Sequence, residues 1–294
     1  MQDTTAHRVI VGLDHSDEAV GALRWALANR GPDDRIVALY AWEVQTLLAA
    51  EGPDTAVSDG FQHMAEVDIA AMLDGVSDAR IAPSARRGRP GKLLVEASQS
   101  ADLVVVGHRG ESRVEMMLGS TANYVLHRAA GPVVIVRTDG EAPVRRVVVG
   151  IDAHGLDVDG AANESVDALR WAYGLPHVET IRLVNAWFLP AVEFGLFNRG
   201  LDVEAFDANA DRAIGLVLDA AGPAPAGVEI TRHVAHAAAG EALVDASADA
   251  DLVVVGSRGR GALRGLLLGS TSAEVAARAR SSVAVVRARG GRNA

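Results

Sequence analysis

A long internal duplication divides this sequence into two similar halves. Residues 101–110, Ala-Asp-Leu-Val-Val-Val-Gly-His-Arg-Gly, recur at 250–259 with Ser in place of His as the one difference, and Leu-Gly-Ser-Thr follows in both copies. Further matched segments lie 145 to 150 residues apart: 22–26 with 168–172, 41–42 with 186–187, and 133–137 with 283–287. A period this long suits a whole domain rather than a solenoid repeat. We therefore predict two domains, 1–140 and 141–294, with the seam at 138–143.

Short apolar segments alternate with helical segments in each half. Strands are predicted at 8–13, 35–42, 81–86, 103–107 and 133–137, and again at 145–151, 180–187, 228–234, 252–256 and 283–287. Helices are predicted near 17–29, 60–79, 91–100 and 119–129. Near-continuous apolar strands indicate a parallel sheet buried on both faces, with right-handed crossover helices on each side. The prediction is an α/β fold with one five-stranded parallel sheet in each half.

In such sheets a ligand lies beyond the carboxyl ends of the strands, where the winding direction reverses. The strand order cannot be read from the sequence. If strands one and four of each half are neighbours, Asp14 and Gly107 flank one crevice, and Asp152 and Gly256 flank the other.

Composition excludes several classes of protein. With 28 Lys and Arg against 38 Asp and Glu, the net charge is −10, which disfavours a nucleic-acid partner. The chain has no cysteine, so disulfides, thiolate metal sites and thiol catalysis are absent. There is no apolar run of 18 residues and no signal-peptide region before the first strand, which predicts a cytoplasmic protein without a membrane partner.

Glycine loops follow the fourth predicted strand of each half. Gly256 and Gly259 allow a phosphate to approach backbone N–H groups, and Gly269 precedes Ser270 and Thr271, whose hydroxyls can donate to phosphate oxygens at a helix N-terminus. The spacing Gly-x2-Gly-x9-Gly-Ser resembles the ATP-binding signature of the universal stress protein family. The resemblance covers essentially the whole chain, including the strand that ends in Gly-x-Asp and the Ala-Leu-x-Trp-Ala helix.

The resemblance implies two tandem Rossmann-like domains, an ATP ligand with or without Mg²⁺, no established catalytic residue and self-association through the last strand. It places Asp152 beside the adenine or ribose, and the backbone around Ala186 against the adenine edge. The cofactor-binding residues expected in the first half are Gly12, Asp14, Ala41, Gly107, Arg109, Gly110, Gly119, Ser120 and Thr121. Those expected in the second half are Gly150, Asp152, Ala186, Gly256, Arg258, Gly259, Gly269, Ser270 and Thr271. No metal ligand is expected from the protein.

The two predicted sites differ. Only eight residues separate Gly110 from Gly119, where the signature has nine, and this stretch carries Glu111 and Glu115 instead of arginines. Negative charge near a triphosphate is unfavourable within a Debye length of roughly 8 Å. We therefore expect ATP at both sites, bound more tightly by the second. The second half also carries an insert at 153–163 that either covers its pocket or lies outside it.

Several residues have structural alternatives to a binding role. Thr271 and Glu274 have the spacing of a capping box, and loop arginines such as Arg258 are commonly solvated. His233 and His236 are interpreted as a surface pair, and the acidic stretch at 157–160 lacks the ligands of a calcium loop. The tryptophans are interpreted as core residues: Trp25, Trp42, Trp171 and Trp187. The segments 43–59 and 188–202 are predicted loops that could act as pocket lids.

The sequence leaves three interpretations of the function open. The favoured class is a non-catalytic ATP-binding module that reports energy or stress conditions to an unknown protein partner, because no general base, metal triad or arginine finger is evident. The alternatives are a slow ATPase or phosphotransferase that uses Asp14 and Asp152 through Mg²⁺, and an interaction protein with vestigial pockets. The apolar end strands predict pairing between the two domains and a homodimer.

Overall fold

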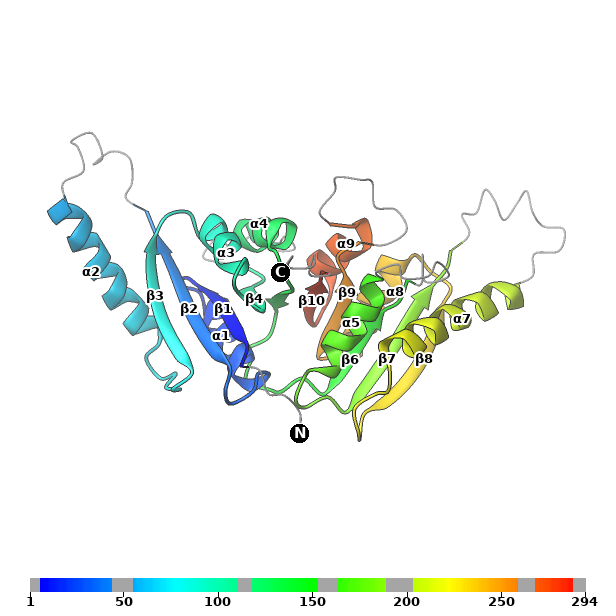
Figure 1. The fold of residues 1–294 in the computed structure, drawn as a ribbon. Helices are drawn as coiled ribbons and strands as arrows, with labels where there is room; N and C mark the ends of the chain where they lie inside the picture. Colours follow the sequence, from blue (N-terminus) through cyan, green and yellow to red (C-terminus); the bar gives the residue numbers. More distant parts are fainter. Residues whose placement is uncertain are drawn as a thin grey trace, which may run out of the picture. The chain divides into compact units, whose positions relative to one another are not determined.

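The structure is a computed structural model that describes residues 6–43, 55–109, 118–152, 163–188, 203–258 and 268–287 (Figure 1). The chain forms two compact units, Met1–Pro143 and Val144–Ala294.

Unit 1 contains a five-stranded parallel sheet. Its strands are β1 (Arg8–Leu13), β2 (Arg35–Trp42), β3 (Ile81–Arg87), β4 (Leu103–Gly107) and β5 (Val133–Val136). Their order in the sheet is β3-β2-β1-β4-β5, and all the described pairings are parallel. Val9 lies opposite Ile36 on one side and opposite Leu103 on the other. The chain therefore winds outward from β1 to β3 and then reverses between β1 and β4.

Unit 2 repeats this topology. Its strands are β6 (Arg146–Gly150), β7 (Thr180–Ala186), β8 (Glu229–Ala235), β9 (Leu252–Gly256) and β10 (Ser282–Val286). The order β8-β7-β6-β9-β10 again places the first and fourth strands side by side, with Val147 opposite Leu252. The strand order that the sequence left open is thus the one in which strands one and four are neighbours, in both units.

Helices connect successive strands. They are α1 (Asp17–Ala28), α2 (Thr55–Met72), α3 (Pro90–Ser98) and α4 (Ser120–Arg128) in unit 1, and α5 (Glu164–Tyr173), α7 (Val203–Ala221), α8 (Ala239–Ala246) and α9 (Ser270–Arg278) in unit 2, with a short 3₁₀ turn at Ser247–Asp249. Right-handed crossovers put the first two helices of a unit on one face of its sheet and the last two on the other. In agreement, α3 packs against α4, α5 against α7, and α8 against α9.

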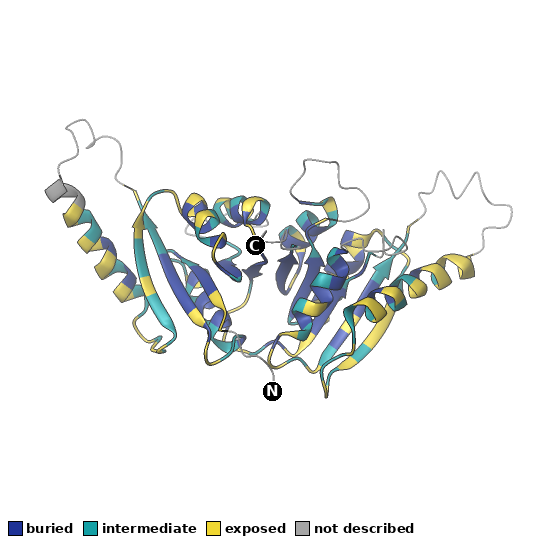
Figure 2. Ribbon diagram, viewed as in Figure 1, coloured by how far each residue is buried: buried dark blue, intermediate teal, exposed yellow. Residues whose placement is uncertain are grey.

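The inner strands form the core of each unit (Figure 2). Val9, Ile10 and Val11 of β1 and Val253 and Val254 of β9 are completely buried. Helix entry is fixed locally, because the side chain of Ser16 accepts the N–H of Ala19 and that of Asn163 accepts the N–H groups of Ser165 and Val166.

One helix differs from its prediction. The segment predicted at 60–79 forms a helix at Thr55–Met72, and Gly75 then adopts a positive φ of 80°. Apolar periodicity continues past Met72, but the left-handed glycine ends the helix there. Among the described helices, none is long and apolar enough to cross a membrane.

Candidate functional site

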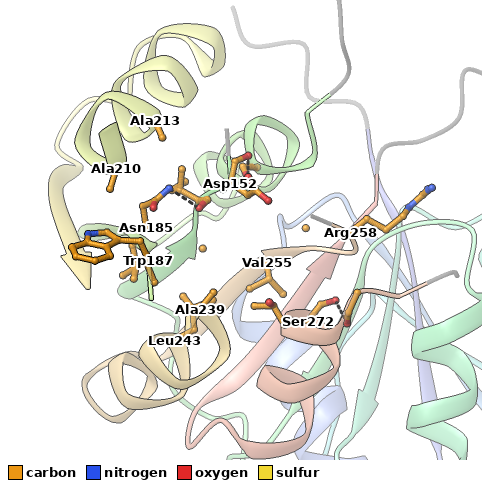
Figure 3. Close-up of a pocket in the computed structure, with 18 of the residues that line it drawn as sticks. Asp152, Asn185, Trp187, Ala210, Ala213, Ala239, Leu243, Val255, Arg258 and Ser272 are labelled. Carbon is orange, nitrogen blue, oxygen red and sulfur yellow. Dashed lines mark hydrogen bonds between the residues drawn. The ribbon is translucent and has the colours of Figure 1, made fainter. Parts of the chain in front are cut away.

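Each unit has a cavity at the carboxyl ends of its strands, at the point where the winding reverses. The cavity of unit 2 measures about 560 Å³ and that of unit 1 about 340 Å³. Figure 3 shows the cavity of unit 2, with Asp152 in its middle, Arg258 toward one end and Trp187 toward the other. This is the location predicted for a ligand in a parallel sheet of this topology.

The structure brings together the predicted site residues that it describes. The cavity of unit 2 is lined by Gly150, Asp152, Ala186, Gly256, Arg258, Gly269, Ser270 and Thr271. The cavity of unit 1 is lined by Gly12, Asp14, Ala41, Gly107, Arg109, Gly119, Ser120 and Thr121. Gly110, Gly259, the charged loop residues 111–115 and 260–264 and the insert at 153–162 lie outside the described residues.

The two ends of the loop between β9 and α9 are fixed by backbone hydrogen bonds. The N–H of Ser257 donates to the carbonyl of Val286 at 2.8 Å, and the N–H of Gly269 donates to the carbonyl of Ser257 at 2.7 Å. In unit 1, the N–H groups of His108 and Gly119 make the equivalent bonds. These bonds hold the start of α9, whose first N–H groups have no partner within the helix, against the end of β9.

Ser272 strengthens this junction in unit 2. Its buried hydroxyl lies 3.0 Å from the carbonyl oxygens of both Ser257 and Gly269, whereas unit 1 has Ala122 at this position. The sequence analysis missed Ser272, although the third hydroxyl residue in the run Ser270-Thr271-Ser272 was a usable signal.

Glu164, the first residue of α5, holds the same loop from the helix side. Its carboxylate accepts the backbone N–H of Arg258 at 2.6 Å and the hydroxyl of Ser257 at 2.9 Å, and it lies 3.3 Å from the guanidinium Nε of Arg258. The Glu164 side chain is only 14% exposed, so these charge-assisted bonds are shielded from water. The sequence analysis also missed Glu164, because its partners are more than 90 residues away in the chain.

The glycines after the fourth strands have a packing role. A Cβ on Gly256 would lie 2.8 Å from Cβ of Glu164, and a Cβ on Gly107 would lie 2.9 Å from the backbone of Glu18. These two positions therefore require glycine because a helix N-terminus packs directly against them, that of α5 at Gly256 and that of α1 at Gly107. A Cβ on Gly269 would lie 3.4 Å from its nearest neighbour, which is ordinary contact.

The aspartates after the first strands contribute to helix entry. In unit 1, the carboxylate of Asp14 accepts hydrogen bonds from the N–H and hydroxyl of Ser16, the N-cap of α1. In unit 2, it is the backbone of Asp152 that is fixed, since its N–H donates to the hydroxyl of Ser165 at 2.8 Å and its carbonyl accepts the amide of Asn163. Asp14 and Asp152 therefore occupy equivalent positions, but Asp14 is bonded to its helix through its carboxylate and Asp152 through its backbone.

The electrostatics of the two loops differ. In unit 1, burial lowers the pKa of His108, and the nearby Arg137 and Arg109 lower it further, while Glu18 opposes them. This imidazole therefore stays neutral at pH 7. The serine at the equivalent position in unit 2, Ser257, instead bonds to Glu164.

Two structural alternatives are wrong. Thr271 does not cap α9: the N-cap is Gly269, the helix begins at Ser270, and Glu274 pairs with Arg278 instead of reaching back to a cap. Of the four tryptophans, only Trp25, at 2% exposure, belongs to the core. Trp42, Trp171 and Trp187 are each only partly buried, and Trp187 lines the cavity. No group of three or more His, Asp or Glu side chains in the described segments is arranged to hold a metal ion.

Comparison with known proteins agrees with this architecture, which is that of a tandem Rossmann-like α/β protein. The sequence profile of the universal stress protein family matches residues 5–137 and 143–287, and the chain belongs to that family. A universal stress protein of Mycolicibacterium smegmatis is 30% identical over 309 residues, covering 98% of this chain and 100% of that protein. One of Mycobacterium tuberculosis is 31% identical over 299 residues, covering 96% and 97%.

Solved structures show the same fold over both units. A universal stress protein from Archaeoglobus fulgidus superimposes with a TM-score of 0.60 at 20% identity, covering 96% of each chain. A putative universal stress protein from Pseudomonas aeruginosa superimposes with a TM-score of 0.59 at 16% identity, covering 97% of this chain and 94% of that one.

Proposed function

We propose that each unit binds one ATP molecule in its cavity and holds it without turnover, so that the bound state reports energy or stress conditions to a protein partner in the cytoplasm. The observation that carries the proposal is the distribution of groups along the cavity of unit 2. Arg258 and the Gly269–Thr271 helix start lie at one end, and the end of β7 at Ala186 lies at the other. Anionic phosphates suit the first end, and a flat base suits the second.

The proposed absence of turnover follows from the chemistry of the lining. In-line attack on a γ-phosphate needs a positioned water and charge neutralisation at the leaving oxygens. Ser120 and Ser270 are neutral donors that would stabilise the ground state as well as the transition state, and uniform binding does not accelerate a reaction. Asp14 and Asp152 follow the first strands, and in this binding mode they face the adenosine end. Any Mg²⁺ would then be held by the phosphates with few protein ligands.

Binding is tested by extracting nucleotide from the purified protein for mass analysis and by calorimetry with ATP. We expect two sites per chain, the tighter one in unit 2. Ser270→Ala should weaken the tighter site and Ser120→Ala the weaker site, each by about 10- to 150-fold, the range for loss of one hydrogen bond to a charged group. Ser100→Ala, at an exposed serine outside both cavities, is the control. Absence of ATP binding would contradict the proposal.

Turnover is tested separately by phosphate release over hours with Mg²⁺. We expect no release above that of the control without protein. Steady release that disappears in Asp152→Ala or Ser270→Ala and survives further purification would instead support the ATPase alternative.

A further inference from the structure

The cavity of unit 2 extends beyond the strand ends toward α7. Its lining there comes from β7, the residue that follows it and the helix: Asn185, Trp187, Phe206, Asn209, Ala210 and Ala213. We call this part the α7 lobe. In Figure 3, Asn185, Trp187, Ala210 and Ala213 lie on one side of Asp152, and Arg258 lies on the other. The lobe is thus at the end of the cavity opposite the proposed phosphate site.

Unit 1 has no equivalent lobe among its described residues, since no residue of α2 lines its cavity. The two units can be aligned here through their indoles. Trp42 stacks on Phe61 and donates its Nε1–H to Gln62, while Trp187 stacks on Phe206 and donates to Asp207. This alignment pairs Asn185 with Tyr40, Asn209 with Met64, and Ala213 with Asp68.

Each of these three replacements makes the unit 1 side chain larger. Tyr40 is also held in place, because its hydroxyl lies 3.2 Å from Nε2 of His15 and the two rings pack edge to face at 5.5 Å. Met64 is 60% exposed, so Tyr40 and Asp68 are the replacements that agree with the smaller unit 1 cavity, about 340 Å³ against about 560 Å³.

The lobe has an apolar, aromatic wall with one polar group. Trp187 and Phe206 stack at 5.0 Å, and Phe206 remains 38% exposed. The indole N–H is already bonded to Asp207, so the rings offer their faces and edges to a ligand rather than a donor. Asn185 donates its amide N–H to the carbonyl of Ile151 at 3.1 Å, which leaves its carbonyl oxygen as an acceptor.

The proposed function sets which part of a nucleotide reaches this lobe. In a purine nucleotide, the ribose is attached to the five-membered ring, so the six-membered ring points away from the phosphates. A ligand with its phosphates at Arg258 and Ser270 therefore directs positions 2 and 6 of the purine toward the lobe.

Resting on that proposed function, we infer that unit 2 accepts purine nucleotides that carry an aromatic substituent on the amine at position 6, and that unit 1 excludes them. The substituent would pack against Phe206 and Trp187, over the small side chains of Ala210 and Ala213, while the N–H that remains on the substituted amine faces the acceptor of Asn185.

The test is calorimetry on the full chain with ATP and with N⁶-benzyl-ATP. We expect ATP to occupy two sites and N⁶-benzyl-ATP one, with an affinity within about tenfold of that of ATP at the unit 2 site. Ala213→Leu should fill the lobe and weaken the analogue by at least about tenfold while changing ATP affinity by less than about threefold. Ala208→Leu makes the same change at an exposed position of α7 that does not line the cavity, and it should affect neither ligand.

A second variant acts by removing contact instead of adding bulk. Phe206→Ala should weaken the analogue by about 3- to 10-fold more than it weakens ATP, because only the analogue's substituent loses its stacking partner. Retained ATP binding shows that each variant is folded. If ATP binds but the analogue binds to both sites or to neither, or if Ala213→Leu weakens ATP and analogue equally, the inference is wrong while the proposed function stands. If ATP itself does not bind, the proposed function fails.

Discussion

The two junctions that follow β4 and β9 differ in single side chains, although the strands that lead into them have the same sequence, Leu-Val-Val-Val-Gly. Glu164 in unit 2 satisfies the N–H of Arg258 and the hydroxyl of Ser257 at once. Its counterpart Glu18 in unit 1 makes no such bond to the described residues. A carboxylate that accepts several hydrogen bonds under low exposure fixes a loop more firmly than a solvated one does. The unit 2 loop is therefore expected to be the more rigid of the two.

Removal of this carboxylate should loosen the loop. Glu164→Ala leaves the N–H of Arg258 without its acceptor, so we expect a loss of about 1–3 kcal/mol in the free energy of unfolding. The amide of Arg258 should also exchange its hydrogen faster in mass-detected exchange. Glu18→Ala is the matched control, expected to stay within about 0.5 kcal/mol of the parent chain. Equal effects of the two substitutions would show that Glu164 has no special role.

The hydrogen bond from Trp187 to Asp207, at the rim of the α7 lobe, is expected to depend on pH. The hydrogen bond from Trp187, and then that from His236, holds the pKa of Asp207 below its ordinary value of 3.8. A carboxyl whose pKa is lower in the folded state contributes stability above its unfolded pKa and loses it as the pH falls through the folded pKa. The Trp187 bond should therefore persist at pH 4 and break only below pH 3.8.

The indole N–H resonances report this change by NMR. We expect the Trp187 resonance to move with a midpoint below pH 3.8, and to stop moving in Asp207→Asn. Trp42 donates to the amide of Gln62, which does not titrate, so its resonance is the internal control. A midpoint at or above pH 3.8 would mean that the bonds to Asp207 are too weak to shift its pKa.

At the scale of elements, the junction between a fourth strand and a helix N-terminus depends on close packing. Gly256→Ala places a methyl group 2.8 Å from Cβ of Glu164, and we expect it to cost about 1–3 kcal/mol through the shift that it forces. Gly269→Ala meets only ordinary contacts at a φ of −78° that alanine adopts, and it should cost less than about 1 kcal/mol. Chemical denaturation without nucleotide measures both. A larger loss for Gly269→Ala would contradict this packing argument.

Much of the fold could be predicted because strands and their order of connection follow local rules. Short apolar runs rich in β-branched residues, such as Leu103–Gly107, favour buried strands, and the duplication repeated this signal in both halves. The end of α2 at Met72 was missed because one glycine conformation outweighed a continuing apolar pattern. The role of Glu164 and the shape of the α7 lobe could not be predicted. They depend on which side chains meet across the sheet, and no local pattern contains that information.

For the whole molecule, the apolar end strands β5 and β10 lead us to expect that the two units pair with each other. Within its own unit, β5 occupies one edge of the sheet, as β10 does in the other, and an apolar edge with unpaired backbone groups must be covered or paired. The chain has no cysteine, so any disulfide that forms must involve the cysteines introduced by mutation. A disulfide needs Cα atoms about 4.4–6.8 Å apart, so only adjacent strands can form one.

We therefore expect some pairs that combine a cysteine at 133–136 with one at 282–286 to cross-link within a single chain. They should keep the mobility of a 30.6 kDa chain on a denaturing gel and lose the free thiols. A pair that joins 133–136 to Thr231 of β8, at the opposite edge of the unit 2 sheet, is the control and should stay reduced. Light scattering on the parent chain then tests the expected homodimer. If no combination cross-links while the control remains reduced, the two edges do not pair, and each must be covered in another way.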